Sequence, residues 1–205
     1  MNISTNLFVI SAPSGAGKTT LVKKLISRNK QLKYSVSYTT RTPRKNEIDG
    51  HDYFFVSIDE FNHLKNKKAF IEHANVFGNL YATSEEQVQN ILKDNHHVIL
   101  EIDWQGAQQV RKSMPQCISI FILPPSQELL NRRLVNRATD TREIIERRLN
   151  EALDDMSHWG EFDYCIINDD LDIAADELEA IFLDKNNYSS TRNPALIKKI
   201  RKILV

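Results

Sequence analysis

Short apolar runs alternate along the chain with segments in which apolar residues recur at helical spacing. Runs typical of buried strands cover residues 7–11, 98–103, 118–123 and 164–167, with a weaker fifth at 34–38. Helical spacing is found at residues 16–28, 84–94, 105–113, 126–136, 141–156 and 173–185. Strands that alternate with helices predict an α/β fold, with a parallel sheet flanked by helices on both faces.

Two segments interrupt this alternation. Residues 39–83 are rich in polar, aromatic and turn residues and predict a small α+β insertion. Residues 132–148 read as helix, loop and helix, and they carry Arg132, Arg133, Arg137, Arg142, Arg147 and Arg148. We therefore expect a core of residues 1–38 and 84–205, which includes the arginine-rich segment, and a separate insertion at 39–83.

Some helix ends are also predicted by local signals. Ser57 with Glu60, and Thr83 with Glu86, have the spacing of a capping box. After residue 185 an apolar and basic pattern at 196–200 predicts a last helix on the surface.

A glycine-rich turn lies between the first strand and the first helix. Its residues are Ala12, Pro13, Ser14, Gly15, Ala16, Gly17, Lys18, Thr19 and Thr20. Strand, glycine-rich turn and helix form the context of a phosphate-binding P-loop, in which backbone N–H groups and the helix dipole meet the anion. Lys18 would reach the outer phosphates and Thr19 would ligate Mg²⁺. Ala12 replaces the first glycine of the strict pattern, and a plain turn with a solvated lysine is the alternative.

The arginine-rich segment has two interpretations. A cluster of arginines is usually a solvated helix face. Because the P-loop already implies a nucleotide, a second phosphate clamp is favoured here, since guanidinium groups bind phosphate oxygens in a bidentate manner.

Composition narrows the classes of partner and compartment. Lysine plus arginine and aspartate plus glutamate both number 27, so no global charge favours nucleic acid or a membrane. Cys117 and Cys165 lie in apolar runs, which predicts buried thiols in a reducing compartment. No apolar run has the length of a membrane span, and the histidines lack metal-ligand spacing. We expect a cytoplasmic protein without nucleic-acid or membrane partners.

A second anion site is expected near the start of the insertion. Arg41 and Arg44 flank a proline, and hydroxyl groups of Ser37, Tyr53 and Tyr81 could join them around a smaller phosphate. A P-loop alone fits a GTPase, an ATPase motor, a nucleoside kinase or a nucleotide kinase. An acceptor that carries its own phosphate favours the last of these.

At this point the sequence closely resembles the guanylate kinase family over about residues 5–185. The matching stretches are 11–19, 35–44, 50–55, 70–74, 78–83, 100–106, 121–125 and 167–170. The resemblance implies a P-loop-type parallel sheet, a small GMP-binding insertion at 39–83 and a helical lid at about 132–148. It also implies Mg²⁺-dependent transfer of the γ-phosphoryl group of ATP to GMP.

The resemblance assigns roles to individual residues. Ser37, Arg41, Arg44, Tyr53 and Tyr81 would hold the GMP phosphate, and Glu72, Thr83 and Asp103 would read guanine. Residues 12–20 would bind ATP, with Asn168 near the adenine end and Arg133, Arg137 and Arg148 closing from the lid. Lys18, Arg41, Arg137 and Arg148 would support the transfer itself. Thr19 would ligate Mg²⁺, and Glu101 would reach it through water.

Several of these residues have simpler interpretations. Thr83 and Asp103 could be helix caps, and Tyr53 and Tyr81 could be core aromatics. Glu72 lies in a strand-like run, where a solvent-facing charge is the default.

The sequence departs from the family pattern at three further positions. Glu101 stands where other members often carry aspartate, and Asn136 and Ala138 replace glycines beside the lid arginines. The latter two leave the mobility of the lid open.

Two other functions are weighed against a guanylate kinase. One is a scaffold domain that has lost catalysis, and the other is a kinase for AMP or UMP. Lys18, Thr19 and the arginines favour an enzyme. The sequence does not decide between a monomer and a homo-oligomer, or whether dGMP is accepted.

Overall fold

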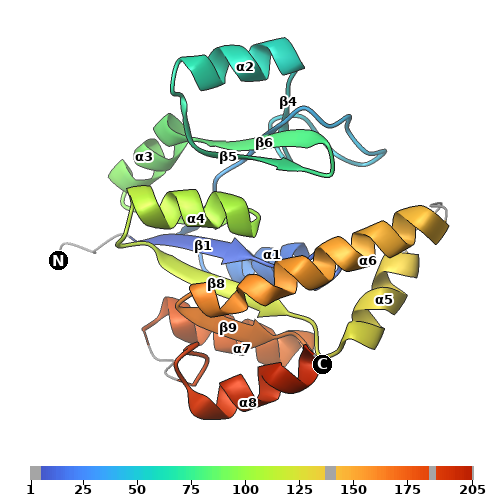
Figure 1. Ribbon diagram of the computed structural model, residues 1–205. Helices are drawn as coiled ribbons and strands as arrows, with labels where there is room; N and C mark the ends of the chain where they lie inside the picture. The colour runs from blue at the N-terminus through green and yellow to red at the C-terminus, as the bar shows by residue number, and fades with distance from the viewer. Residues whose placement is uncertain (1–5, 137–141, 185–187, 205) are drawn as a thin grey trace. The chain divides into compact units, whose positions relative to one another are not determined.

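The structure is a computed structural model that describes residues 6–136, 142–184 and 188–204 (Figure 1). The chain divides into two compact units. The first comprises Met1–Val9 with Lys30–Ile118, and the second comprises Ile10–Asn29 with Ser119–Val205.

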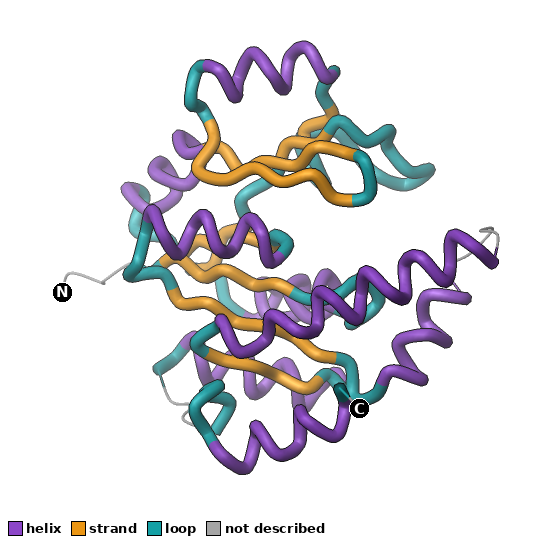
Figure 2. The backbone as a smooth tube through the Cα atoms, viewed as in Figure 1, coloured by secondary structure: helices purple, strands orange, loops and turns teal. Residues whose placement is uncertain are grey.

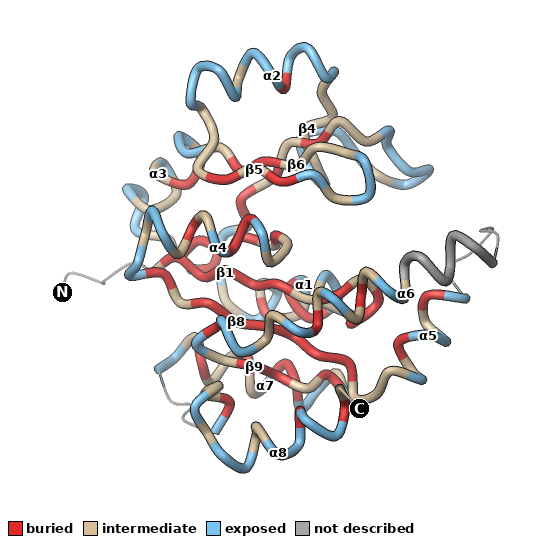
Figure 3. Tube along the Cα trace, viewed as in Figure 1, coloured by how far each residue is buried: buried red, intermediate tan, exposed pale blue. Residues whose placement is uncertain are grey.

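A five-stranded sheet confirms the predicted α/β class. Its strands are β2 (Leu32–Tyr34), β7 (His97–Glu101), β1 (Leu7–Ser11), β8 (Ile118–Leu123) and β9 (Tyr164–Ile167), in that order. The pairs β2–β7 and β8–β9 are parallel. Every residue of β1 and nearly every residue of β8 is buried, as the red tube of Figure 3 shows. Continuous apolar strands of this kind are typical of a parallel sheet covered on both faces.

Each predicted helix is present, and its ends differ from the prediction by at most three residues. The helices are α1 (Lys18–Arg28), α3 (Glu85–Lys93), α4 (Trp104–Ser113), α5 (Gln127–Asn136), α6 (Arg142–Ser157) and α7 (Leu171–Phe182). A 3₁₀ turn, η1 (His158–Glu161), follows α6. Helix α7 begins before the predicted residue 173 because the Asp170 carboxylate accepts hydrogen bonds from the N–H groups of Asp172 and Ile173.

The predicted C-terminal helix is confirmed as α8 (Pro194–Ile203). The side chain of Asn193 accepts from the N–H of Ala195, and Pro194 follows at the first helical position, where its missing N–H costs nothing.

A second, four-stranded sheet lies in the first unit. Its order is β4 (Phe54–Phe55), β3 (Tyr38–Thr39), β6 (Asn79–Ser84) and β5 (Phe70–Val76). Helix α2 (Ile58–Asn66) lies between β4 and β5 in the chain. Strands β5 and β6 form an antiparallel hairpin, which Figure 2 draws in orange. The small α+β character expected for this segment is confirmed.

The strand predicted at residues 34–38 is wrong as a single element. Leu32–Tyr34 pairs with β7, and the N–H of Ser35 still donates to the carbonyl of Ile99 at 3.1 Å. Tyr38–Thr39 instead pairs with β6 of the other sheet. Ser35 and Ser37 are buried between the two pairings. One short segment therefore contributes strands to two different sheets, and its periodicity cannot show where the first strand ends and the second begins.

One of the two predicted helix caps is also wrong. The side chain of Ser57 accepts from the N–H of Glu60 and caps α2 as expected. Helix α3 is capped by Ser84, whose hydroxyl accepts from the N–H of Gln87 at 3.3 Å, and not by Thr83. The hydroxyl of Thr83 is already engaged with Glu72.

Both cysteines are free thiols and are buried, as predicted. Burial raises the pKa of the Cys165 thiol far above its usual range. No helix within the described ranges 6–136, 142–184 and 188–204 combines the length and apolar character needed to cross a bilayer.

Candidate functional site

The glycine-rich turn joins β1 to α1 in a conformation that requires its glycines. Gly15 and Gly17 both have φ of +91°, in the left-handed region that residues with a Cβ rarely adopt. Gly17 is the N-cap of α1, so no side chain there can accept the N–H groups of the first helical turn. These donors have no carbonyl partner within the helix, which makes this end of α1 suited to an anion.

The space around the two glycines is closed. A Cβ at position 17 would lie 2.5 Å from Nδ2 of Asn168, and one at position 15 would lie 3.0 Å from Cδ1 of Leu130. Leu130 and Leu134 of α5 are buried against this turn. Leu130 and Leu134 of α5 thus limit the space on one side of the turn.

A pocket of about 400 Å³ opens beside the turn in the second unit. Its lining residues are Gly15, Gly17, Thr20, Arg133, Asn168, Asp169 and Leu171. Five of the predicted nucleotide residues are thus brought together from the turn, α5 and the end of β9. Asp169 and Leu171 were not predicted as site residues, although the 167–170 stretch had been singled out as a motif.

Asn168 is connected directly to the glycine-rich turn. It is 4% exposed, and its Nδ2 donates to the carbonyl oxygen of Ala16 at 2.7 Å. Its own N–H donates to the carbonyl of Leu123 at the end of β8. The residue therefore fixes the turn to the edge of the sheet as well as lining the pocket.

Replacing Asn168 with alanine is expected to lower the free energy of unfolding by about 1–3 kcal/mol, because the buried carbonyl of Ala16 loses its donor. The Michaelis constant for ATP should rise as the turn loosens. Denaturant unfolding and initial-rate kinetics measure the two effects. Asn79→Ala is the matched control, because it removes an exposed hydrogen bond from the side-chain amide to the carbonyl of Phe77. An equal response from both variants would show that the turn does not depend on Asn168.

The lid predictions fall outside what the structure describes. Arg137 and Ala138 lie outside the described residues, as do the side chains of Asn136 and Arg148. Of the three lid arginines with a predicted role, Arg133 lies among the described residues, in the wall of the 400 Å³ pocket.

Arg41 is the centre of the predicted acceptor-phosphate site in the first unit. Its guanidinium donates to both carboxylate oxygens of Glu47, at 2.8 and 2.9 Å, and to the carbonyl of Thr42. Its Cζ lies 5.4 Å from the ring centroid of Tyr53 and 5.7 Å from that of Phe55. Aromatic rings and a carboxylate thus hold the guanidinium in one orientation.

These contacts perturb the ionisation of the pair. Burial lowers the pKa of Arg41, but the hydrogen bonds and charge interactions with Glu47 and Tyr81 together raise it above its ordinary value. The hydrogen bond from Arg41 lowers the pKa of Glu47, with burial opposing it. Glu47 was missed in the sequence, where the only signal was an acid six positions after Arg41 in the same loop.

Tyr53 and Tyr81 lie beside this guanidinium. Their rings meet edge to face, with centroids 6.0 Å apart. Burial raises the pKa of Tyr53 to about 12, and the charge of Glu101 at the end of β7 adds to the rise. The Tyr53 phenol therefore keeps its proton at neutral pH and can donate to an anion.

The other two residues predicted to hold the acceptor phosphate differ in burial. Ser37 is 5% exposed, and its carbonyl accepts from the N–H of Phe54. The Arg44 side chain is 74% exposed, and its Nη1 lies 3.7 Å from Glu47. The loop thus holds the Arg41 guanidinium by several contacts, whereas the Arg44 side chain is exposed and has an ion pair with the same Glu47.

The three predicted base-reading residues meet between β5, β6 and α4, all in the first unit. Glu72 is 3% exposed, and the Thr83 hydroxyl donates to its Oε1 at 2.6 Å. A bulge in β5 between Phe70 and Glu72 sets the two residues opposite each other. The default of a solvent-facing Glu72 is wrong, since the bulge turns this carboxylate inward.

Asp103 lies at the start of α4, close to the same carboxylate. Its Oδ1 accepts from the N–H of Gly106 at 2.9 Å, so the simpler interpretation as a helix cap is correct for this oxygen. Oδ2 is not used in that bond. A buried glutamate, a hydroxyl and an aspartate thus form one acceptor-rich cluster.

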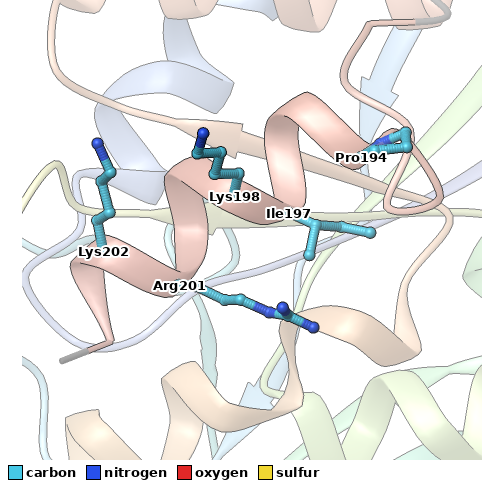
Figure 4. Close-up of a pocket in the computed structure, with 5 residues that line it drawn as sticks. All are labelled: Pro194, Ile197, Lys198, Arg201 and Lys202. Carbon is cyan, nitrogen blue, oxygen red and sulfur yellow. The ribbon is translucent and has the colours of Figure 1, made fainter.

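A further hollow lies on α8 in the second unit, away from any predicted site residue. It is lined by Pro194, Ile197, Lys198, Arg201 and Lys202. Figure 4 shows Lys198 and Lys202 extending to one side of the helix, with Ile197 and Arg201 on another. The hollow combines apolar lining surface with the side chains of three basic residues.

Comparison with known proteins places the chain among close relatives. The sequence profile of the family described as guanylate kinase matches residues 4–185. A guanylate kinase of Alkalilimnicola ehrlichii is 50% identical over 198 residues, which cover 97% of this chain and 98% of that protein. One of Pseudomonas fluorescens is 54% identical over 176 residues, covering 86% and 85% of the two chains.

A solved structure agrees with these relatives. The crystal structure of guanylate kinase from Anaplasma phagocytophilum matches with a TM-score of 0.74 and 32% sequence identity. The match covers 98% of this chain and 96% of that one.

Proposed function

We propose that two clusters of polar residues bind the two substrates of this chain, which belongs to the guanylate kinase family. The chain transfers a phosphoryl group from ATP to GMP, giving GDP and ADP. The turn at residues 12–20, with Arg133 and Asn168, binds ATP. The residues around Arg41 and Glu72 bind GMP, within an acceptor-binding segment at 39–83. The buried Glu72–Thr83 pair carries the substrate assignment, because Glu72 is a buried carboxylate and the Thr83 hydroxyl bonds to it and does not cap α3.

In the first cluster, the backbone N–H groups of the glycine-rich turn and the end of α1 hold the ATP phosphates. Lys18, the first residue of α1, directs its ammonium to the phosphoryl group in transit. Arg137 and Arg148 add positive charge from the lid. The pocket beside Gly15 and Gly17, with Arg133 in its wall, supports this placement.

Mg²⁺ is proposed to enter with ATP. Within the described part of the chain, no group of three or more His, Cys, Asp and Glu side chains could hold a metal ion. Mg²⁺ commonly takes only one or two protein oxygens and completes its shell with water and substrate phosphates. The exposed Thr19, second in α1, offers one such oxygen, and Glu101 would act through water. The bound ion would neutralise charge on the phosphates.

In the second cluster, Arg41, Tyr53, Tyr81 and Ser37 receive the GMP phosphate, and Arg44 closes on it from solvent. The attacking group is an oxygen of that phosphate, which is already anionic near neutral pH. The reaction therefore needs no general base, and the protein contributes positioning and charge neutralisation. Glu47 keeps the Arg41 guanidinium oriented before GMP arrives.

Arg41→Met is expected to raise the Michaelis constant for GMP by roughly 10- to 100-fold, the loss typical of a hydrogen bond to a charged group. The constant for ATP should stay nearly unchanged. Initial-rate kinetics with each substrate varied measure both values, and Arg201→Met on the exposed face of α8 is the control. Equal losses for ATP and GMP would show that Arg41 does not hold the acceptor phosphate.

The nucleotide acceptor itself is tested by a coupled ADP-release assay with Mg-ATP and a panel of GMP, dGMP, AMP, UMP and CMP. GMP should give the highest kcat/KM in the panel. A comparable value for AMP or UMP would contradict the base assignment while leaving the kinase assignment intact.

A further inference from the structure

Gly106 lies in direct contact with the Glu72 carboxylate. A Cβ at position 106 would be 2.4 Å from Oε2 of Glu72, 3.1 Å from its Cδ and 3.2 Å from Oδ1 of Asp103. A carbon at 2.4 Å from an oxygen is far inside van der Waals contact. The carboxylate therefore occupies the volume that any other residue at position 106 would fill.

The backbone gives no other reason for glycine at this position. Gly15, Gly17, Gly50 and Gly78 have positive φ, whereas Gly106 does not and lies within the first turn of α4. Glycine inside a helix is destabilising by roughly 0.5–1 kcal/mol relative to alanine. A residue that costs stability here must be explained by the space it leaves.

The elements on both sides of this contact are fixed. The N–H of His73 donates to Oε1 of Gln109 at 3.1 Å, and Nε2 of Gln109 donates back to the carbonyl of His73 at 2.8 Å. These two hydrogen bonds join β5 to α4 at the residue that follows Glu72. A methyl group at position 106 would therefore displace the flexible end of the Glu72 side chain, while the helix and strand stay in place.

We propose that Gly106 is a positioning residue for nucleobase selectivity, because its missing side chain sets where the Glu72 carboxylate lies. This inference rests on the proposed role of Glu72 in reading guanine. The hydrogen bond from Thr83 holds Oε1, and the contact with Gly106 lets Oε2 lie over the first turn of α4. The positive end of the helix dipole is directed at that oxygen. Alanine would push the carboxylate out of this position and away from the guanine donors.

Gly106→Ala should lower kcat/KM for GMP by about 100-fold, the loss associated with misplacing a binding group by about 1 Å. The loss should appear mainly in the Michaelis constant for GMP. The constant for ATP should change by less than about twofold, and the melting temperature should be kept or raised because alanine favours helix. Gly160→Ala is the matched control, since a Cβ there would meet no atom within 4 Å outside the adjacent backbone.

A double variant separates this inference from the proposed function. In a Glu72→Ala background the obstacle is gone, so adding Gly106→Ala should cost less than about twofold in kcat/KM for GMP. A normal GMP constant in Gly106→Ala, or the same large loss in both backgrounds, would overturn the positioning role. If Glu72→Ala itself leaves the ratio of GMP to AMP unchanged, the guanine assignment fails instead.

Discussion

Lys18→Ala is expected to lower kcat by two to three orders of magnitude, or about 3–4 kcal/mol, in a protein that folds normally. Lys18 is the first residue of α1 and directly follows Gly17, whose left-handed backbone turns the chain into the helix. A charge fixed at that point stabilises the phosphoryl group most while it moves between two anions. No buried apolar contact is lost, because the buried residues of α1 are Leu21, Val22 and Leu25.

The measurement for Lys18→Ala is kcat under saturating ATP and GMP, together with thermal unfolding. Lys23→Ala removes an exposed ammonium from the same helix and should retain kcat within about twofold. Near-normal turnover in folded Lys18→Ala protein would remove the glycine-rich turn from the mechanism. A loss of the same size in Lys23→Ala would show that general charge on α1, and not the position of Lys18, is responsible.

The glycine-rich turn could be predicted from sequence because its determinants are local. Gly15 and Gly17 are needed for the positive φ, and the strand and helix on either side are continuous in the chain. Four strands of the five-stranded sheet were equally accessible, since a strand buried on both faces, such as β8, is a nearly unbroken apolar run, whereas β2 was not predicted with its own bounds. The spacing of glycine and apolar residues along the chain is enough to predict the turn and these buried strands.

The acceptor side depends on contacts between distant segments, and the sequence pattern alone predicted it less well. A charged residue in a strand-like run is expected to face solvent, and the bulge in β5 beside Glu72 has no signal in the run. Thr83 and Ser84 are equally good caps by composition, and the choice follows from the Glu72 carboxylate that takes the Thr83 hydroxyl. The Arg41–Glu47 pair forms through a loop whose path no periodicity describes.

Glu72→Gln is expected to collapse the preference for GMP over AMP. Guanine presents two adjacent donors, N1–H and the 2-amino group, and a carboxylate that only accepts is their complement. Adenine has neither donor, so AMP would leave a 3% exposed carboxylate without a partner on the base. Sites that reject a ligand by leaving a buried polar group unpaired discriminate by about four to five orders of magnitude.

The substitution is informative because it preserves shape and the neighbouring contact. The amide oxygen of glutamine can still accept from the Thr83 hydroxyl, now 2.6 Å from Oε1, so the β5–β6 pairing should be retained. The amide nitrogen would then take the place of Oε2 and direct a donor at the donors of guanine. Repulsion between this donor and the guanine donors, together with loss of the negative charge, should weaken the binding of GMP far more than that of AMP.

The decisive quantity is the ratio of kcat/KM for GMP to that for AMP, measured in the unmodified protein, in Glu72→Gln and in Glu86→Gln. Glu86 is an exposed carboxylate in the first turn of α3, so its amide variant should keep the original ratio. A fall confined to Glu72→Gln, with an unchanged Michaelis constant for ATP, would assign guanine recognition to this one side chain. A ratio that is small in the unmodified protein would mean that guanine is not preferred over adenine. A large ratio that the substitution leaves unchanged would mean that the buried carboxylate serves the fold and that guanine is recognised elsewhere.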